Sequence, residues 1–277
     1  LIMSFASEVR GELARLSQTD ACCARSELTA ALLCSGGIAW RGRNRYAVTI
    51  TASEAPTVRR YFAMLKQFYG IIGQIRTLSG DALNSQTRYQ LAVPEEEAAG
   101  LLEALNLLDE AALFGVRAVP EGETVRFACC RKAFVRAAFL MCGAVSHPDR
   151  SYHLEIAAPT EALADFIAAQ LRYFEINVKK TCRKSKFVVY LKRAEEISDA
   201  LSLLGASGSM LAFENVRVKK EVSNRVNRQL NCDNSNINRA VSAAEKVVLP
   251  VRAAQVIAAF LAAEPVAVRA ENLVHHP

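Results

Sequence analysis

The sequence predicts an α+β fold built from two copies of one helix–strand–strand–helix–strand–strand–helix unit. The first observation is a stretch that occurs twice: residues 22–38 read CCARSELTAALLCSGGI, and residues 129–145 read CCRKAFVRAAFLMCGAV. Each copy is an apolar, helix-like run that ends in small residues and precedes an alternating strand pattern. The second observation is that the same order of helices and strands follows both copies, which indicates an internal duplication.

The composition is that of an ordinary globular chain. With 277 residues, of which 51% are hydrophobic, it can bury sizeable cores in two or three structural units. No apolar run approaches the roughly 20 residues that cross a bilayer, and the N-terminus lacks the order of a signal peptide. We therefore expect no membrane partner and a cytoplasmic location.

The first copy is preceded by an amphipathic helix over residues 4–16, in which Phe5, Val9 and Leu13 recur at helical spacing. Residues 28–34 are apolar or small around the whole circumference, so this helix needs a close partner. The other elements follow from strand alternation, helix stripes and Gly or Pro stops. The expected elements are a buried helix over 22–34, a strand over 46–51, a helix over 57–68, strands over 71–78 and 89–93, and a helix over 95–108.

The second copy repeats this order after a joint over residues 109–128. Its expected elements are a buried helix over 129–142, a strand over 152–156, a helix over 160–173, strands over 176–181 and 187–191, and a helix over 194–204. Two helices that cannot bury themselves alone, one in each copy, most economically bury each other. Cys34 and Cys142 are expected to be in close contact there.

The C-terminal part is expected to contain several shorter helices. Residues 213–230 are amphipathic, the Asn-rich run 231–238 is expected to interrupt the helix, and further helices are expected over 239–247 and 252–263, separated by Pro250. The expected domains are 1–108 (first repeat), 109–128 (linker), 129–213 (second repeat), 214–248 (basic helix and Asn-rich linker) and 249–277 (remnant of a further domain).

Positive charge is concentrated in the second half. Residues 129–239 hold 18 Lys and Arg against 11 Asp and Glu, a net charge of +7, whereas the whole chain has +6. The strongest concentration is a hairpin that contains no acidic residue, and we favour phosphate contact over protection of a sheet edge. The hairpin cations considered for DNA binding are Lys179, Lys180, Arg183, Lys184, Lys186 and Lys192.

Two further segments are candidates for DNA contact. The helix over 213–230 has a face of Arg, Lys and Asn, which can contact both phosphates and base edges. A turn with three arginines is equally well interpreted as a phosphate contact or as a solvated turn. These candidates are Arg217, Lys220, Asn224, Arg225 and Arg228 in the helix, and Arg41, Arg43 and Arg45 in the turn.

Eight cysteines give no disulfide framework in a chain without secretory features, because cytosolic thiols stay reduced. The adjacent pairs Cys22-Cys23 and Cys129-Cys130 are not C-x-x-C motifs, and the four histidines give no zinc spacing. We therefore interpret the cysteines as structural thiols and expect no metal and no cofactor.

The duplicated unit resembles the LAGLIDADG homing-endonuclease fold, in which two signature helices pack at a pseudo-twofold axis and the sheets form a saddle over duplex DNA. Over residues 3–247 the chain more closely resembles the WhiA family. The residues that carry this resemblance are Ser4-Phe5, Glu8-Val9, Cys22-Cys23, Glu27-Leu28, Gly36-Gly37, Cys129 to Arg131, Ala138 to Leu140, Ser151 to Glu155, Arg183 to Lys186, Val188 to Leu191, Glu214 to Arg217, Asn224 to Arg228, Asn231-Cys232 and Asn236.

The resemblance implies a DNA-binding regulator of Gram-positive bacteria that does not cleave its target. Such a protein would bind double-stranded DNA at the nucleoid and act in transcription regulation, sporulation, cell division or chromosome segregation. The family also carries a C-terminal helix-turn-helix domain, of which the residues after Val247 provide enough for only one helix. Either truncation of the chain or divergence of its C-terminal tail would explain this difference from the family.

We consider two alternative functions, and the first of them requires particular residues. A LAGLIDADG-type endonuclease needs metal-binding carboxylates at the ends of the two central helices, but the equivalent positions are Gly36 and Gly143, and the nearest acids are Glu27 and Asp149. Catalytic residues are therefore expected to be absent. The other alternative is a protein-interaction scaffold that has lost DNA binding.

Recognition of RNA is less well supported, because the strand-borne tyrosines at 46, 89, 152 and 190 do not form a clustered stacking platform. One residue argues against DNA binding. Glu155 is expected on the exposed strand face beside His153, where it would repel phosphate. Either it pairs with a neighbouring Lys or Arg, or it marks a surface that binds protein.

Overall fold

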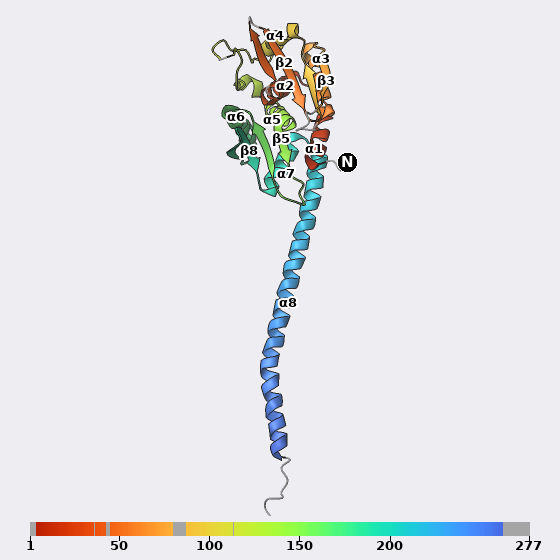
Figure 1. Cartoon of the computed structure of the whole chain (residues 1–277), viewed down its shortest axis with the longest axis vertical. Helices are drawn as coiled ribbons and strands as arrows, with labels where there is room; N and C mark the ends of the chain where they lie inside the picture. The colour runs from red at the N-terminus through yellow and green to blue at the C-terminus, as the bar shows by residue number, and fades with distance from the viewer. Residues whose placement is uncertain (1–3, 36, 43–44, 80–86, 113, 263–277) are drawn as a thin grey trace, which may run out of the picture. The chain divides into compact units, whose positions relative to one another are not determined.

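The computed structural model describes residues 4–35, 37–42, 45–79, 87–112 and 114–262. The chain divides into a unit that ends at Val218 and a second unit that begins at Lys219. The first unit contains both copies of the repeat (Figure 1). The second consists, as far as it is described, of one helix that begins in the first unit.

The two repeats have the same order of elements, as the sequence predicts. After α1 (Phe5–Ala14), the first repeat comprises α2 (Ala21–Ser35), β1 (Ile38–Gly42), β2 (Arg45–Ala52), α3 (Ala55–Tyr69), β3 (Gln74–Leu78), β4 (Arg88–Ala92) and α4 (Glu95–Ala104). A short 3-10 helix, η1 (Gly122–Val125), precedes the second repeat. The second repeat comprises α5 (Ala128–Cys142), β5 (Gly143–Val145), β6 (Leu154–Ala158), α6 (Glu161–Tyr173), β7 (Lys179–Arg183), β8 (Lys186–Leu191) and α7 (Ala194–Leu204).

Each repeat contains one antiparallel four-stranded sheet, with strand orders β1-β2-β4-β3 and β5-β6-β8-β7. In the first sheet Ile50 lies opposite Leu91, and in the second Ile156 lies opposite Val189. All four side chains are buried, so they define the inner face of each sheet, which packs on the helices. The alternate residues of the same strands face outward.

Helices α2 and α5 pack against each other in the middle of the first unit (Figure 1). The facing surfaces are apolar or small, and Leu28, Ala31, Phe134 and Ala138 are all fully buried. Small residues let two helix backbones approach closely. The prediction that the two repeated helices bury each other is confirmed.

Glu27 lies within this helix pair and is fully buried. Its carboxylate accepts two hydrogen bonds from Arg60 of α3, one of them 2.9 Å long, and lies 3.7 Å from Nη1 of Arg136 in α5. Burial alone would lower the pKa of Arg60, but the hydrogen bond and the charge of Glu27 outweigh it, so the pKa of Arg60 is raised. The pKa of Arg136 is lowered, mainly because this side chain is largely removed from water. One carboxylate therefore connects α2 both to its own repeat and to the other.

Helix α8 runs without interruption over Ser207–Ala262, so the prediction that the Asn-rich run and Pro250 end helices is wrong. Ser235 Oγ donates to the carbonyl of Asn231 at 2.8 Å, one turn back, so this side chain bonds within the helix. An asparagine in the interior of a helix makes helix formation less favourable by only about 0.7 kcal/mol relative to alanine. Pro250 removes one backbone hydrogen bond, and the helix continues through it.

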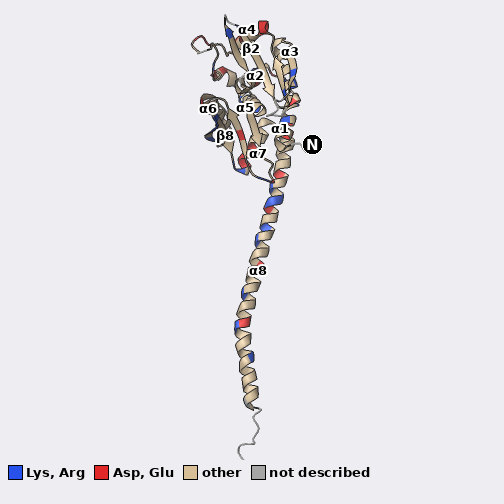
Figure 2. Cartoon of the chain, in the orientation of Figure 1, with Lys and Arg blue, Asp and Glu red and all other residues tan. Residues whose placement is uncertain are grey.

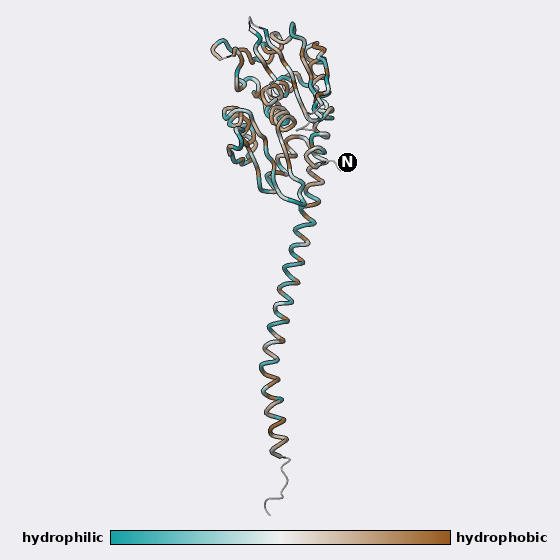
Figure 3. The backbone as a smooth tube through the Cα atoms, in the orientation of Figure 1, coloured by the Kyte–Doolittle hydropathy of each residue, from teal (hydrophilic) through white to brown (hydrophobic). Residues whose placement is uncertain are grey.

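The described residues 221–260 of α8 are exposed, including valines and leucines at positions 222, 226 and 230. Figure 3 shows apolar and polar residues mixed along this helix. Among the described residues, no helix is both long enough and apolar enough to cross a membrane.

We expect Glu27→Gln to lower the free energy of unfolding by about 3–5 kcal/mol, because it leaves the buried guanidinium group of Arg60 and the partly buried one of Arg136 without a carboxylate. Equilibrium urea unfolding measures the change. The control is Glu95→Gln, which removes an exposed pair with Arg45 and is expected to cost less than about 1 kcal/mol. Equal, small effects of both variants would show that the buried network does not stabilise the helix pair.

Candidate nucleic-acid interface

The outer face of the second sheet carries a shallow hollow of about 530 Å³. Glu155 lies opposite Tyr190, and Thr181 opposite Val188, which places these alternate residues of β6, β7 and β8 on one surface. The residues that line the hollow are Ser151, Tyr152, His153, Glu155, Thr181, Arg183, Val188, Tyr190 and Lys192. We call this surface the outer face of the second sheet.

The β7–β8 hairpin borders this face with a tight two-residue turn. Lys184 and Ser185, which connect Arg183 to Lys186, have φ angles of 47° and 63°. Two successive left-handed residues suit the twist of a hairpin but cost non-glycine residues about 1–2 kcal/mol each. The turn holds Arg183 and Lys186 directly opposite each other.

The strand register separates the predicted hairpin cations into two groups. Lys179 lies opposite Tyr190 and Arg183 opposite Lys186, so these cations belong to the outer face. The ammonium group of Lys192 joins them, 5.5 Å from the centre of the Tyr190 ring. Lys180 differs: it lies opposite Val189 of the inner face and forms an ion pair with Asp165 of α6.

Glu155 is paired rather than isolated on the outer face. Its Oε2 lies 2.9 Å from Nε2 of His153 and 4.0 Å from Nη1 of Arg183. Of the two alternatives drawn from the sequence, pairing with a neighbouring base is the one observed. The hairpin itself holds no acid, but the fold supplies Glu155 and Asp165 from other elements, so its charges repel one another less than the sequence alone indicates.

The predicted helical contacts lie in the first part of α8. Arg217 forms ion pairs with Glu214 at 2.8 Å and with Glu195 of α7 at 3.4 Å, so its charge is largely compensated. Asn224, Arg225 and Arg228 are exposed, and Lys220 is partly exposed. Figure 2 shows that Lys and Arg alternate with a few acids along the helix.

The three-arginine turn belongs to the first sheet. Arg41 lies in β1, and Arg45, at the start of β2, forms an exposed ion pair of 3.6 Å with Glu95. Arg43 lies outside the described residues. These arginines therefore do not extend the outer face of the second sheet.

The position at the end of α5 has no room for a side chain. A Cβ atom at Gly143 would lie 2.6 Å from the carbonyl oxygen and 2.7 Å from the Cα atom of Phe139. Gly36, the other predicted position, lies outside the described residues. Of the nearest acids, Glu27 is buried among arginines, and Asp149 lies 3.4 Å from Nδ1 of His147.

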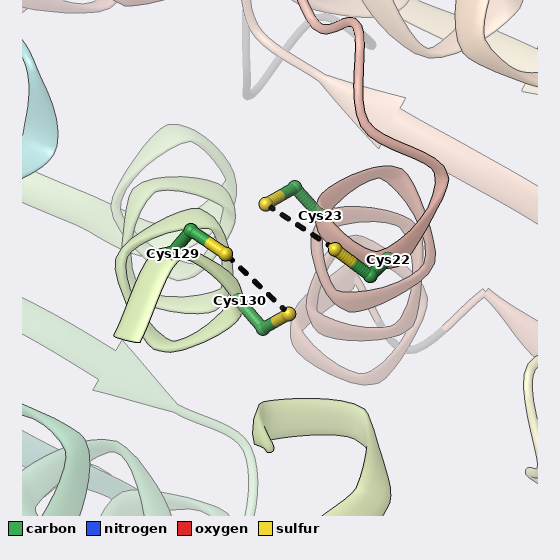
Figure 4. A group of neighbouring side chains, drawn as sticks. All are labelled: Cys22, Cys23, Cys129 and Cys130. Carbon is green, nitrogen blue, oxygen red and sulfur yellow. Dashed lines mark hydrogen bonds between the residues drawn. The ribbon is translucent and has the colours of Figure 1, made fainter. Parts of the chain in front are cut away.

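The structure also brings together four cysteines that the sequence indicates to be structural thiols. The sulfur atoms of Cys22, Cys23, Cys129 and Cys130 all lie within 4.8 Å of one another (Figure 4). The signal in the sequence was the Cys-Cys pair at the same place in two helices that were expected to pack together. At the other ends of these helices the thiols of Cys34 and Cys142 interact, as expected.

The ionisation of the four thiols is coupled. Burial and the neighbouring thiols raise the pKa of Cys23 and Cys130. Burial opposes ionisation of Cys129 as well, but hydrogen bonds from the other three thiols lower its pKa overall. We call these four residues the four-thiol cluster.

Two αββαββα repeats that pack through their first helices define a LAGLIDADG-like protein. Two family models match the chain: the WhiA N-terminal LAGLIDADG-like domain over residues 21–108 and the WhiA LAGLIDADG-like domain over residues 131–223. A "Probable cell division protein WhiA" from Heliobacterium modesticaldum is 34% identical over 254 residues, which cover 91% of this chain and 79% of the relative. The chain belongs to the WhiA family.

Other comparisons agree. A relative of the same description from Desulforamulus reducens is 34% identical over 87% of this chain and 75% of its own. The crystal structure of full-length DUF199/WhiA from "Thermatoga maritima" superposes with a TM-score of 0.64 at 18% identity, covering 86% of this chain and 73% of that one. The crystal structure of the N-terminal LAGLIDADG domain of DUF199/WhiA superposes with a TM-score of 0.55 at 17% identity, covering 74% of this chain and 94% of that one. These two structures support the fold.

We expect Gly143→Ala to lower the free energy of unfolding by about 1–3 kcal/mol, because the added methyl group must displace the backbone of Phe139. Urea unfolding measures the change. Gly100→Ala is the matched control: Gly100 lies in helix α4 with open space around it, so alanine there should stabilise by about 0.5–1 kcal/mol. If Gly143→Ala also stabilised the protein, the position would have room for a side chain.

Proposed function

We propose that this protein binds duplex DNA without cleaving it and acts as a regulator. The observation that carries the proposal is the outer face of the second sheet, where Arg183 and Lys192 line an open hollow and the strand register places Lys179 and Lys186 on the same face. Cations on one surface bind the regularly spaced phosphates of a duplex, and the release of condensed counterions drives the association.

The aromatic residues favour a duplex over a single strand as the ligand. Tyr46 is buried, and the ring of Tyr152 packs against Phe213 at 5.7 Å. Single-strand modules need exposed aromatic rings on which successive bases stack. On the outer face, Tyr190 contacts His153 and Lys192 instead.

Helix α8 provides a second group of polar contacts. Asn224, Arg225 and Arg228 are exposed, and their side chains suit both phosphates and base edges. We propose that this segment adds to the affinity, with Lys220. Because Arg217 is engaged by two carboxylates, its contribution should be smaller than that of the exposed residues.

The proposed absence of cleavage is supported by the described residues at and near the end of α5, where a metal-binding carboxylate would be needed. Gly143 leaves no space for a side chain, and the carboxylate of Glu27 is engaged by Arg60 and Arg136. Neither can hold a divalent cation against a scissile phosphate.

The biological role is proposed from the family. The curated relatives carry the description "Probable cell division protein WhiA", and we propose a role in cell division for this chain as well. We extend the proposal to transcription regulation linked to sporulation and chromosome segregation, at the nucleoid. The proposed role in transcription regulation rests on the DNA binding proposed above.

We expect the affinity for duplex DNA to fall steeply with salt and the triple variant Lys179→Ala, Arg183→Ala, Lys186→Ala to flatten this dependence. For every phosphate that the variant no longer neutralises, the slope of log K against log salt concentration should become shallower by about 0.9. Fluorescence anisotropy with a labelled duplex, over a series of salt concentrations, measures the slope.

Lys180→Ala is the matched control, because this neighbouring lysine faces α6 and not the outer face. It should leave the slope nearly unchanged, as should Arg41→Ala with Arg45→Ala. If the triple variant bound DNA as the wild type does, the outer face would not be the DNA contact. If the wild type bound no duplex at all, the protein-interaction alternative would replace this proposal.

We also expect no strand cleavage. Supercoiled plasmid incubated with the purified protein and Mg²⁺ or Mn²⁺ should remain supercoiled, as followed on an agarose gel. Metal-dependent conversion to the nicked or linear form, abolished by EDTA, would contradict the proposal.

A further inference from the structure

The four-thiol cluster combines residues that lie far apart in the sequence. Cys22 and Cys23 belong to the first turn of α2, and Cys129 and Cys130 to the first turn of α5. The two helices pack side by side, so each contributes two sulfur atoms to the same space, as Figure 4 shows. Such an arrangement offers four ligands of one chemical kind from two rigid elements.

The separations of the sulfur atoms fit a single tetrahedral ion. Zn–S bonds of about 2.3 Å place the sulfur atoms of a Cys₄ site about 3.8 Å apart. Here the sulfurs of each adjacent pair are 4.0 Å apart, and all four lie within 4.8 Å of one another. Small rotations of the side chains would close this set around an ion.

We propose that the four-thiol cluster is a structural Zn²⁺ site that clamps the two repeats together at the start of their central helices. Four thiolates in tetrahedral arrangement are the ligand set of closed structural zinc sites. Hard cations such as Mg²⁺ prefer oxygen ligands and six-fold coordination, which this set does not offer.

Burial raises the pKa of Cys23 and Cys130, but the position of the four thiols in the fold favours thiolates. Both Cys pairs lie at helix N-termini, where the partial positive charge of the backbone N–H groups stabilises an anion.

The burial pattern suits a structural role. Cys23 and Cys130 are buried and pack with Ala133, whereas Cys22 is partly exposed and Cys129 exposed. Zinc can therefore enter from the solvent side. All four protein ligands would be used, so no coordination position would remain for water or substrate.

The proposal is tested on the full chain, purified without chelator and analysed for metals by mass spectrometry. We expect about one zinc ion per chain, and titration of metal-free protein with Co²⁺ should give the intense visible absorption of a tetrahedral thiolate complex, which Zn²⁺ abolishes. The double variant Cys22→Ser, Cys129→Ser should retain less than about a tenth of the zinc, because only two thiolates remain.

Two control variants are made in the same full chain and measured in the same way. Cys34→Ser with Cys142→Ser alters thiols at the opposite ends of the same helices, and Cys182→Ser with Cys232→Ser alters exposed thiols elsewhere. Both should retain zinc as the wild type does. Removal of zinc with a chelator should lower the melting temperature of the wild type and of both controls, but not that of the Cys22→Ser, Cys129→Ser variant.

Three results would overturn the proposal: a folded wild type that neither retains zinc nor gives the cobalt spectrum, the same zinc content in the cluster variant, or iron in place of zinc. Disulfides between the four cysteines in protein prepared under reducing conditions would overturn it as well. None of these measurements involves DNA, so the zinc site and the proposed DNA binding succeed or fail separately.

Discussion

The buried carboxylate of Glu27 is the interaction on which the arrangement of the first unit depends. It lies between the guanidinium groups of Arg60, in its own repeat, and Arg136, in the other. A buried charge loses its hydration, and this cost is offset only when an opposite charge and hydrogen bonds replace the water. The network therefore favours the observed alignment of α2 on α5, because sliding of one helix along the other would separate Glu27 from Arg136.

That alignment determines what lies at the two ends of the helix pair. At the start of both helices it brings the four thiols into one space, and at the other end it brings Cys34 and Cys142 into contact. Where α5 passes into β5, Gly143 packs on Phe139 too closely for any side chain. The same packing that holds the repeats together thus leaves no room for a side chain at Gly143, which is the described one of the two positions where a nuclease of this fold would need a metal-binding carboxylate.

The duplication, the two buried helices and the order of strands were predictable because they follow from hydrophobic periodicity, which is local in the sequence. The continuity of α8 was not: asparagine costs a helix only about 0.7 kcal/mol per residue, and although an interior proline costs about 3 kcal/mol, the helix continues through Pro250. The ion pair of Lys180 with Asp165 was not predictable for another reason: the side of the strand on which Lys180 lies is set by the register with β8, and a shift of one residue exchanges the two faces. The four-thiol cluster depends on the packing of helices about a hundred residues apart, which the spacing of cysteines along the chain does not reveal.

The two repeats have kept one scaffold and diverged in charge. In the first sheet the strands equivalent to β7 and β8 carry Arg76 and Arg88 in their described residues, and Arg76 is bonded to Gln74 of the same strand. In the second sheet the hairpin carries several cations, of which Lys180 is neutralised by Asp165 and Arg183 lies 4.0 Å from Glu155. Because unpaired charge and not the number of basic residues drives counterion release, the outer-face lysines Lys179, Lys186 and Lys192 should contribute more to polyanion binding than Arg183. The asymmetry in charge between the repeats is therefore the reason that we propose the second sheet, and not the first, as the main DNA contact.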